Sequence, residues 1–425
     1  MNRIIRRLRG NALAQNTLWM SIGHGCRLVV QFVYFIIIAR ALGPQGYGAF
    51  ISVVALSAIL SPFCGWGASH LLVRDVARDP DTFRHSWGNA VVRSLVYGSV
   101  LLGVILIASR YVLPGSISPL LVLLVGTSDL LFARILDTSS FAFLAFQRLG
   151  WTAKLQALLS ICRLGAATAL VSISAAPTPV QWGFFYLLST SFTAMVGLWL
   201  VNRKLGTPKV RLAGLTSDLI TGFYFSLSIA SQNVQNDIDK TMLARLSTLE
   251  ASGIYGAAYR LVQVTFTPIR ALGYSSYARF FQHGASGIKG SLGFARRLVL
   301  YAGGYGLSAG VALFLMAPLL PFVLGADYRD AVGAVRWLAF LPFLKAMQYF
   351  AADALTGAGF QGIRSGVQLG VALVNVLMLL VLVPAYSWLG AAWASLAADT
   401  LLMLGLWSSV LYLHTKVENE ATQSM

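Results

Sequence analysis

One stretch near the N-terminus places polar and charged side chains on a single helical face. Asn16, Met20, His24, Arg27 and Gln31 follow one another at steps of four, four, three and four residues, which is the spacing of one face of an α-helix. Only Met20 interrupts the polar face. An arginine amid apolar sequence is costly in lipid, so this face is expected to line a polar cavity, where Arg27 would contact an anion such as pyrophosphate. In the alternative interpretation, Arg27 pairs with an aspartate of another helix.

Two further arginines occupy one later apolar run. Arg260 and Arg270 are ten residues apart, about 80° around a helix axis, so both would border one broad cavity. Arg270 follows Pro268 by two residues, at a point where a helix distortion frees backbone groups. Arg260 is the weaker candidate for an anion contact, because pairing with Asp237 or Asp239 would also explain it. Asp237 itself lies three residues before Lys240, a spacing that favours a local pair on a helix.

Other buried charges have acidic neighbours that offer a structural interpretation. Arg134 lies three residues before Asp137, a spacing that favours a local pair on a helix, and Arg163 would then face Asp129. A role lining the cavity is the alternative for both arginines. The candidate substrate-binding set comprises six basic residues, namely Arg27, Arg270, Arg260, Lys345, Arg134 and Arg163.

Four titratable side chains within apolar runs are candidates for coupling transport to an ion, H⁺ or Na⁺. They are His24, Asp239, Asp353 and Asp399. His24 lies one turn before Arg27, so its protonation would respond to an anion bound there. Asp353 lies eight residues after Lys345, on the same helical face, and a pair between these two is the structural alternative. The membrane potential alone is the other driving force to consider.

Transmembrane helices must position these residues. The chain has 425 residues, of which 57% are hydrophobic and 11% charged, whereas a soluble domain carries roughly 25% charged residues. Runs this long and apolar satisfy their backbone in lipid only as helices, and a chain of this length has room for about a dozen. The runs predict helices at 12–39, 47–70, 88–109, 119–145, 151–175, 180–201, 218–243, 252–277, 298–323, 331–355, 363–384 and 388–413.

The distribution of basic residues predicts the orientation of these helices. With the N-terminus inside, the cytoplasmic segments hold 19 of the 32 Lys and Arg residues and the outer segments hold 4. This bias places both termini in the cytoplasm. The remaining nine lie within the predicted helices beside six acids. The net charge of +17 is therefore explained by topology and by a cationic interior, and no nucleic acid is expected as a partner.

The second half of the chain repeats the first. Residues 36–63 align with 241–269, such that Ala39-Arg40 matches Ala244-Arg245, Tyr47-Gly48 matches Tyr255-Gly256, and Pro62 matches Pro268, at offsets of 205, 208 and 206. Three matches in order indicate a duplication. We expect two parallel six-helix bundles, 1–201 and 218–425, joined by a cytoplasmic linker at 202–217, an architecture typical of transporters.

Three segments carry a resemblance to a known family. ARALGPQGYGAF, NDIDKTMLARLSTLEASGIYGAAYRL and, near the last predicted helix, LGAAWAS together resemble the polysaccharide repeat-unit flippases of the multidrug/oligosaccharidyl-lipid/polysaccharide exporter superfamily. The resemblance implies that an undecaprenyl-pyrophosphate-linked oligosaccharide is moved from the cytoplasmic to the periplasmic leaflet of the bacterial inner membrane. It also implies a role in O-antigen or exopolysaccharide assembly, with a polymerase and a chain-length regulator as partners.

Sequence motifs for other functions are missing. HExxH and GxxxxGK[ST] do not occur, and neither the GxSxG at 306–310 nor the GxGxxG at 357–362 has a preceding strand, so no enzyme, cofactor or metal site is expected. A membrane polymerase or ligase is one alternative, but the outer connections of about ten residues are short for catalytic loops. An ion-coupled drug exporter is the other, although its mostly cationic cargo suits a basic interior poorly.

Overall fold

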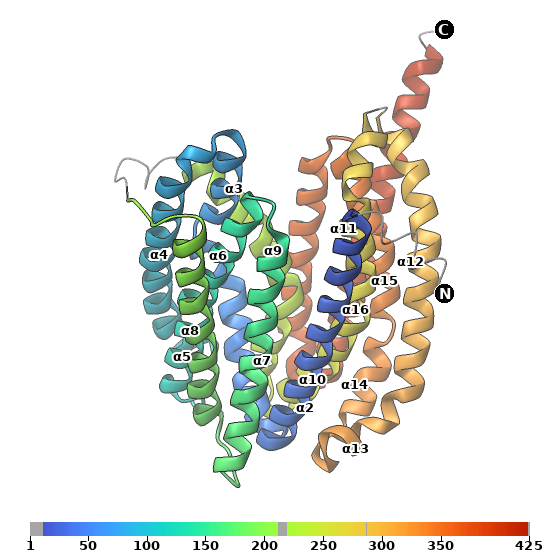
Figure 1. Cartoon of the computed structure of the whole chain (residues 1–425). Helices are drawn as coiled ribbons and strands as arrows, with labels where there is room; N and C mark the ends of the chain where they lie inside the picture. Colours follow the sequence, from blue (N-terminus) through green and yellow to red (C-terminus); the bar gives the residue numbers. More distant parts are fainter. Residues whose placement is uncertain (1–11, 211–218, 286, 424–425) are drawn as a thin grey trace, which may run out of the picture. The chain divides into compact units, whose positions relative to one another are not determined.

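A computed structural model describes residues 12–210, 219–285 and 287–423 (Figure 1). Within these ranges the chain forms helices and short turns and no strand. The all-helical prediction is therefore confirmed. Residues 211–217 of the predicted linker lie outside the described residues.

The helices group into two compact units. Unit 1 contains the residues up to 42 and 53–230, and unit 2 contains 43–52 and the residues from 231 onward. The chain therefore passes between the units after residues 42, 52 and 230. Each unit consequently holds a short segment that comes from the other half of the sequence.

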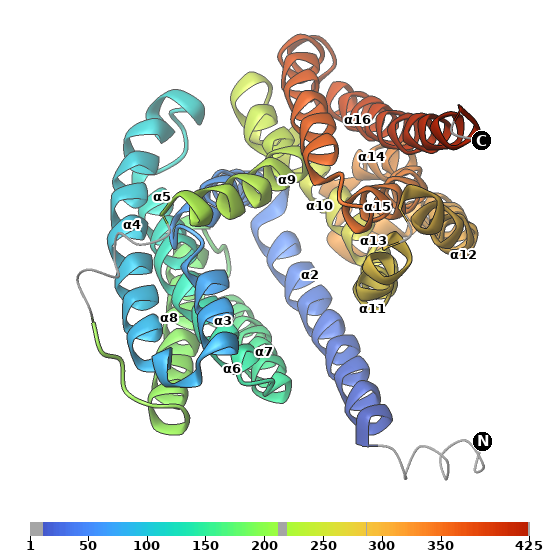
Figure 2. The same cartoon turned by 90° about the horizontal axis from the view of Figure 1, so that it is seen from above.

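Unit 1 is a helical bundle built around aromatic residues. Besides parts of α2 (Ala12–Leu60) and α9 (Leu219–Leu246), it contains η1 (Ser61–Phe63), α3 (Ala68–Arg78), η2 (Pro80–Thr82), α4 (Phe83–Val112), α5 (Pro119–Gly126), the π-helical η3 (Thr127–Phe132), α6 (Ala133–Ala145), α7 (Leu149–Ile173) and α8 (Pro179–Lys204). Helix α6 packs against α3, α7 and α8 (Figure 2). Trp87 and Phe143 are fully buried in this core, where each contributes a large apolar area.

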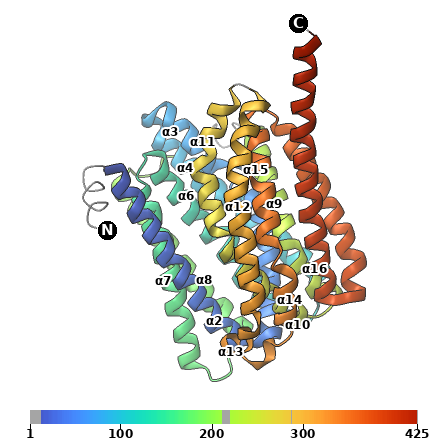
Figure 3. The ribbon, with the colours of Figure 1, turned by 90° about the vertical axis from the view of Figure 1, so that its right-hand side faces the viewer.

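Unit 2 is a second bundle centred on α15. Besides the rest of α2 and α9, it contains α10 (Leu249–Thr265), α11 (Thr267–Gly284), α12 (Ile288–Met316), η5 (Ala317–Leu319), α13 (Leu320–Leu324), η6 (Ala326–Tyr328), α14 (Ala331–Leu338), α15 (Leu341–Gly357) and α16 (Gln361–Gln423). Helix α15 packs against α11, α12 and α16 (Figure 3). Phe280, Phe350 and Leu355 are fully buried in this core.

Two of the long helices are each two helices joined at a kink. In α2 the break is at Gly43, with φ 64° and ψ 175°, followed by Pro44. In α16 it is at Ser387, with φ 54° and ψ −133°, three residues after Pro384. Proline in a helix interior removes a backbone donor and distorts the helix. These kinks lie between the predicted helices 12–39 and 47–70 and between 363–384 and 388–413, so all twelve predicted spans coincide with helical structure.

The two prolines matched by the sequence repeat also break helices at corresponding places. Pro62 lies in the 3₁₀ turn η1 that ends the long α2. Pro268 lies in the first turn of α11, directly after α10 ends. Both prolines therefore interrupt a predicted span at its middle, as a duplicated element should.

Seven helical runs among the described residues are long and apolar enough to cross a membrane, and the chain is a multi-pass membrane protein. The runs are Arg27–Arg78, Pro80–Val112, Pro119–Ala145, Gly150–Ile173, Pro179–Lys204, Ile288–Leu324 and Gln361–Val417. Helices α9, α10, α11, α14 and α15 are not among them. Their polar residues require an environment other than lipid.

A close backbone contact docks the segment 43–52 within unit 2. A Cβ atom on Gly253 of α10 would lie 1.9 Å from the Pro44 carbonyl oxygen, and one on Gly48 would lie 1.7 Å from the Leu249 carbonyl oxygen. Only glycine permits this approach. Nearby, the Ser52 and Ser252 hydroxyls are 2.9 Å apart, so the segment is also held by buried hydrogen bonds.

Candidate functional site

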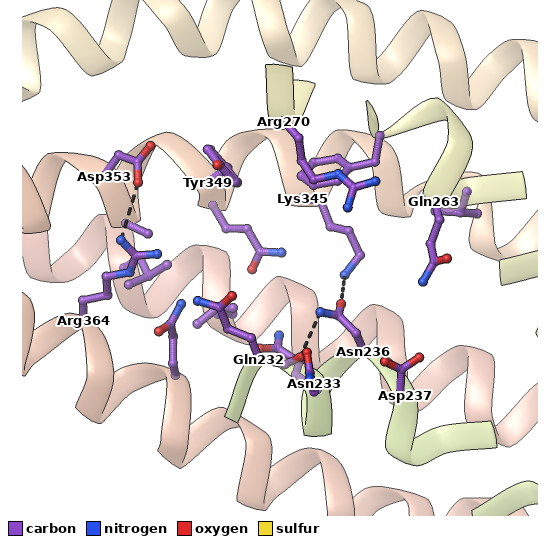
Figure 4. Close-up of a pocket in the computed structure, with 18 of the residues that line it drawn as sticks. Gln232, Asn233, Asn236, Asp237, Gln263, Arg270, Lys345, Tyr349, Asp353 and Arg364 are labelled. Atoms are coloured by element: carbon purple, nitrogen blue, oxygen red, sulfur yellow. Dashed lines mark hydrogen bonds and ion pairs between the residues drawn. The ribbon is translucent and has the colours of Figure 1, made fainter. Parts of the chain in front are cut away.

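Unit 2 contains a cavity of about 570 Å³, which we call the unit 2 pocket. Its walls come from α9, α10, α11, α15 and α16, together with Phe266 at the junction of α10 and α11. Figure 4 shows polar side chains from several of these helices converging on this space. Four of the five helices are among those that are not both long and apolar enough to count as membrane spans, and many of their polar side chains line the pocket.

Carboxamides dominate the pocket wall. Seven side chains of this type line it, namely Gln232, Asn233, Gln235, Asn236, Gln263, Gln348 and Gln368. Tyr259, Tyr277, Tyr349 and Phe266 add aromatic surface, and the charged lining residues are Arg270, Lys345, Arg364, Asp237 and Asp353. A carboxamide both donates and accepts hydrogen bonds. The pocket is thus rich in neutral groups that match a hydroxylated ligand.

Lys345 is paired across the bundle. Its Nζ lies 3.2 Å from Asp399 Oδ2 on α16 and donates to Asn236 Oδ1 at 3.2 Å. Gln348 and Gln235 donate to the other carboxylate oxygen of Asp399, at 3.0 and 3.2 Å. The alternative pair between Lys345 and Asp353 is therefore not formed. Both carboxylate oxygens of Asp399 are occupied.

Asp353 is paired with Arg364, which lies at the start of the predicted helix 363–384. Their closest N–O distance is 3.5 Å, and Arg364 also donates to Thr356 Oγ1 at 2.7 Å. Figure 4 shows this pair at one end of the pocket. Asp353 is 3% exposed, and among the described residues its Oδ2 has no hydrogen-bond partner. Arg364 thus lines the pocket while its charge is paired with Asp353.

The buried Asp239 belongs to a compact ionic network beside the pocket. Lys240 Nζ lies 2.9 Å from Asp237 and 3.3 Å from Asp239, so the predicted pair of Asp237 with Lys240 is confirmed. The Tyr255 hydroxyl donates to Asp239 Oδ2 and lies 2.8 Å from the Ser395 hydroxyl. Asp239 is 1% exposed and does not line the pocket. Its charge is compensated within the protein.

Arg270 differs from the other pocket cations. It is exposed, lines the pocket, donates to Thr267 Oγ1 at 3.3 Å and lies 5.8 Å from the centre of the Phe266 ring. Among the described residues it forms no ion pair with an acid. Its positive charge is available to a ligand.

Arg260 is not among the residues that line the pocket. It donates to Gln263 Oε1 at 3.4 Å, while Asp237 and Asp239 are both held by Lys240. The structure therefore does not bring Arg260 and Arg270 together in the unit 2 pocket. Arg260 instead contacts Gln263, which does line the pocket.

The candidates in unit 1 are held by local contacts. Arg134 forms the predicted pair with Asp137, at 2.7 Å. The Arg163 guanidinium lies 4.2 Å from the centre of the Tyr186 ring, and the Tyr186 hydroxyl donates to Asp129 Oδ1 at 3.0 Å. Tyr186 thus links the arginine to the aspartate expected to face it.

The polar face of the first helix is described only from its second half. Arg27 is half-buried in the unit 1 part of α2. Gln31, on the same face, donates to Ser160 Oγ at 3.5 Å, so this face is turned toward α7. The side chains of Asn16, Met20 and His24 lie outside the described residues.

Sequence reasoning missed most of the carboxamides. The run Ser231-Gln232-Asn233-Val234-Gln235-Asn236-Asp237 holds four amides in five consecutive positions within an otherwise apolar region, and that concentration was the available signal. Gln263, Gln348 and Gln368 are isolated in sequence. Only helix packing brings them to the same wall.

Comparisons with known proteins place the chain in context. The family described as polysaccharide biosynthesis protein matches residues 13–273. No curated protein sequence matches the chain. Beyond this family, the chain is similar to proteins of known structure.

Solved structures with the same fold are transporters. A multidrug resistance MATE family transporter of the MOP superfamily, in an inward-facing conformation, aligns with a TM-score of 0.75 at 14% identity, covering 94% of this chain and 96% of that one. The lipid II flippase MurJ, in an inward closed conformation, aligns with a TM-score of 0.77 at 11% identity, covering 92% and 87%. A MOP superfamily transporter from Pyrococcus furiosus, described as having a binding pocket of reverse polarity, aligns with a TM-score of 0.56 at 15% identity, covering 93% and 95%. At these identities the likeness establishes the fold.

Proposed function

The chain belongs to the polysaccharide biosynthesis protein family and has a MOP-superfamily transporter fold, and on this basis we propose that it flips lipid-linked oligosaccharides. The substrate is an oligosaccharide repeat unit joined through pyrophosphate to undecaprenol. The movement runs from the cytoplasmic to the periplasmic leaflet of the bacterial inner membrane and supplies surface polysaccharide assembly, such as O-antigen or exopolysaccharide. A polymerase and a chain-length regulator are the partners that would use the product.

The observation that carries this proposal is the composition of the unit 2 pocket. An unpaired cation, Arg270, shares the cavity with seven carboxamides and several aromatic rings. A pyrophosphate-linked sugar has the matching parts, since its phosphate needs a cation and its hydroxyls need neutral donors and acceptors. A purely apolar cargo would leave the amides without partners.

The free-energy cost of placing sugar hydroxyls in lipid determines where each part of the substrate lies. Each sugar hydroxyl transferred into hydrocarbon without a partner costs roughly 4–8 kcal/mol. The head group must therefore stay in the polar interior while the prenyl chain stays in lipid. We assign the pyrophosphate contact to Arg270. Movement by alternating access then exposes the occupied interior first to one side of the membrane and then to the other.

The remaining candidates take secondary places in the proposal. Arg27 stays a candidate contact in unit 1. Lys345 contributes positive potential to the pocket, but its ammonium group is paired with Asp399. Arg134 and Arg163 are engaged by Asp137 and Tyr186, which favours the structural interpretation for both.

Among the acidic candidates for ion coupling, Asp353 is the best placed. Asp239 and Asp399 are each held by a lysine ammonium, whereas the buried Asp353 Oδ2 has no hydrogen-bond partner within the residues that the structure describes. H⁺ or Na⁺ would bind at that oxygen. Flipping into proteoliposomes should then respond to an imposed H⁺ or Na⁺ gradient, and an Asp353→Asn variant should lose the response.

Gene deletion tests the function directly. A strain without this protein should accumulate an undecaprenyl-pyrophosphate oligosaccharide on the cytoplasmic leaflet and lose a surface polysaccharide, and the wild-type gene should restore both. Unchanged lipid-linked intermediates together with unchanged surface polysaccharide would contradict the proposal. In that case, a changed sensitivity to cationic drugs would favour the exporter alternative.

A further inference from the structure

We infer that the unit 2 pocket recognises uncharged sugar residues and discriminates against acidic ones. The inference rests on the proposed function and adds the charge class of the glycan. It follows from which pocket charges remain available, from the chemistry of the other lining groups and from the size of the cavity.

The charges around the pocket are nearly all compensated within the protein. Three ion pairs account for them, namely Lys345 with Asp399 at 3.2 Å, Arg364 with Asp353 at 3.5 Å, and Lys240 with Asp237 at 2.9 Å. Arg270 alone among the lining cations that the structure describes has no acidic partner. Since the pyrophosphate takes Arg270, a sugar carboxylate entering the pocket would find no free cation and would meet Asp353 and Asp237 on the wall.

Gln348 supplies an acceptor that is fixed in orientation. Its Nε2 donates to Asp399 Oδ1 at 3.0 Å. This bond directs the amide nitrogen toward the carboxylate and leaves Oε1 as an acceptor for another group. The residue lines the pocket yet is only 8% exposed, and Oε1 has no hydrogen-bond partner in the described part of the chain. A buried acceptor without a donor is unfavourable. A sugar hydroxyl or the N–H of an acylamino sugar would satisfy it, whereas a carboxylate, which has only acceptors, would not.

The rest of the wall suits a sugar ring. Phe266 and Tyr349 meet edge to face, with ring centroids 6.1 Å apart, and offer apolar surface to the C–H face of a pyranose. The carboxamides of α9 lie across from Arg270 and Lys345 in Figure 4. The volume of about 570 Å³ lies within the roughly 300–1,000 Å³ usual for ligand pockets, which suits a short oligosaccharide better than a phosphate alone.

A transport comparison tests the inference. The full-length protein is reconstituted in liposomes with one of two undecaprenyl-pyrophosphate trisaccharides, identical except that a neutral hexose in one is a hexuronic acid in the other. Flipping is measured by access of a membrane-impermeant oxidant to the sugar. We expect the neutral lipid to be flipped at least tenfold faster.

A charge added to the wall should change this preference. Gln232 lines the pocket on α9, and Gln232→Lys introduces a cation that has no acidic partner. This variant should raise flipping of the uronic-acid lipid relative to the neutral lipid at least fivefold, whereas Gln232→Met, which has a similar length and no charge, should not raise flipping of the uronic-acid lipid. A gain for one substrate cannot arise from misfolding.

The outcomes separate the two proposals. Equal flipping of the two lipids, faster flipping of the acidic lipid, or a ratio that Gln232→Lys does not change would overturn the inference while leaving the flippase function in place. Failure to flip either lipid by a folded protein would overturn both.

Discussion

At the scale of single residues, the pocket separates charges that hold the protein together from one that is free to bind. Spacing along one helix predicted two local pairs, Asp237 with Lys240 and Arg134 with Asp137, because residues three apart are neighbours on a helix surface. It did not predict the pair of Lys345 with Asp399, whose members are 54 residues apart on different helices. Pairs of that kind depend on packing, which a single sequence does not show.

Replacing Arg270 should impair transport without impairing folding. Its described contacts are a 3.3 Å hydrogen bond to Thr267 and the nearby Phe266 ring, so little stability depends on it. Arg270→Ala should reduce flipping by about ten- to a hundredfold, since a hydrogen bond to a charged group contributes about 1.5–3 kcal/mol. Arg270→Lys should retain more activity. Full flipping by the alanine variant, at normal membrane levels, would remove Arg270 from the proposed phosphate contact.

Replacing Lys345, in contrast to Arg270, should lower the stability of the protein. Lys345→Met leaves Asp399 as a buried carboxylate without its cation, and breaking a buried pair costs about 3–5 kcal/mol. Thermal unfolding of the purified protein should therefore begin at a lower temperature. The double variant Lys345→Met with Asp399→Leu should recover most of the loss, because it removes both charges. If the double variant is as unstable as the single one, the pair is not the source of the stability.

At the scale of elements, apolar runs predicted where the long helices lie. The gaps between the predicted helices 12–39 and 47–70 and between 363–384 and 388–413 coincide with the kinks at Gly43 and Ser387. The sequence could not assign short segments to a unit. Residues 43–52 belong to unit 2 and residues 219–230 to unit 1, and these assignments depend on contacts such as that between Gly48 and α10. Nothing in hydrophobicity or charge distinguishes them.

The glycine contact between α2 and α10 should tolerate no added methyl group. Gly253→Ala would place Cβ 1.9 Å from the Pro44 carbonyl oxygen, and overpacking of this kind typically costs about 1–3 kcal/mol. Gly165→Ala in α7 is the matched control, since a Cβ there meets nothing within 4 Å. That variant should be neutral or more stable by up to about 1 kcal/mol, because alanine favours helix. Similar unfolding temperatures for the two variants would contradict the close approach.

At the scale of the whole molecule, the distribution of basic residues predicts a definite orientation in the membrane. In a variant without native cysteines, a cysteine at Ala176, between α7 and α8, should react with an impermeant thiol reagent in intact spheroplasts. A cysteine at Thr207, after α8, should react only after permeabilisation. The reverse pattern would place both termini outside and refute the predicted direction of transport.

Because the units exchange segments, one segment is synthesised well before the helix that it packs against. Residues 43–52 dock in unit 2 against α10, which begins at Leu249, 197 residues beyond Ser52. At roughly 5–20 residues per second of translation, this segment waits about 10–40 s for its partner. Until then Ser52 lacks the Ser252 hydroxyl that it meets in the finished protein. The nascent chain therefore carries an incomplete interface on this segment until the second half has been synthesised.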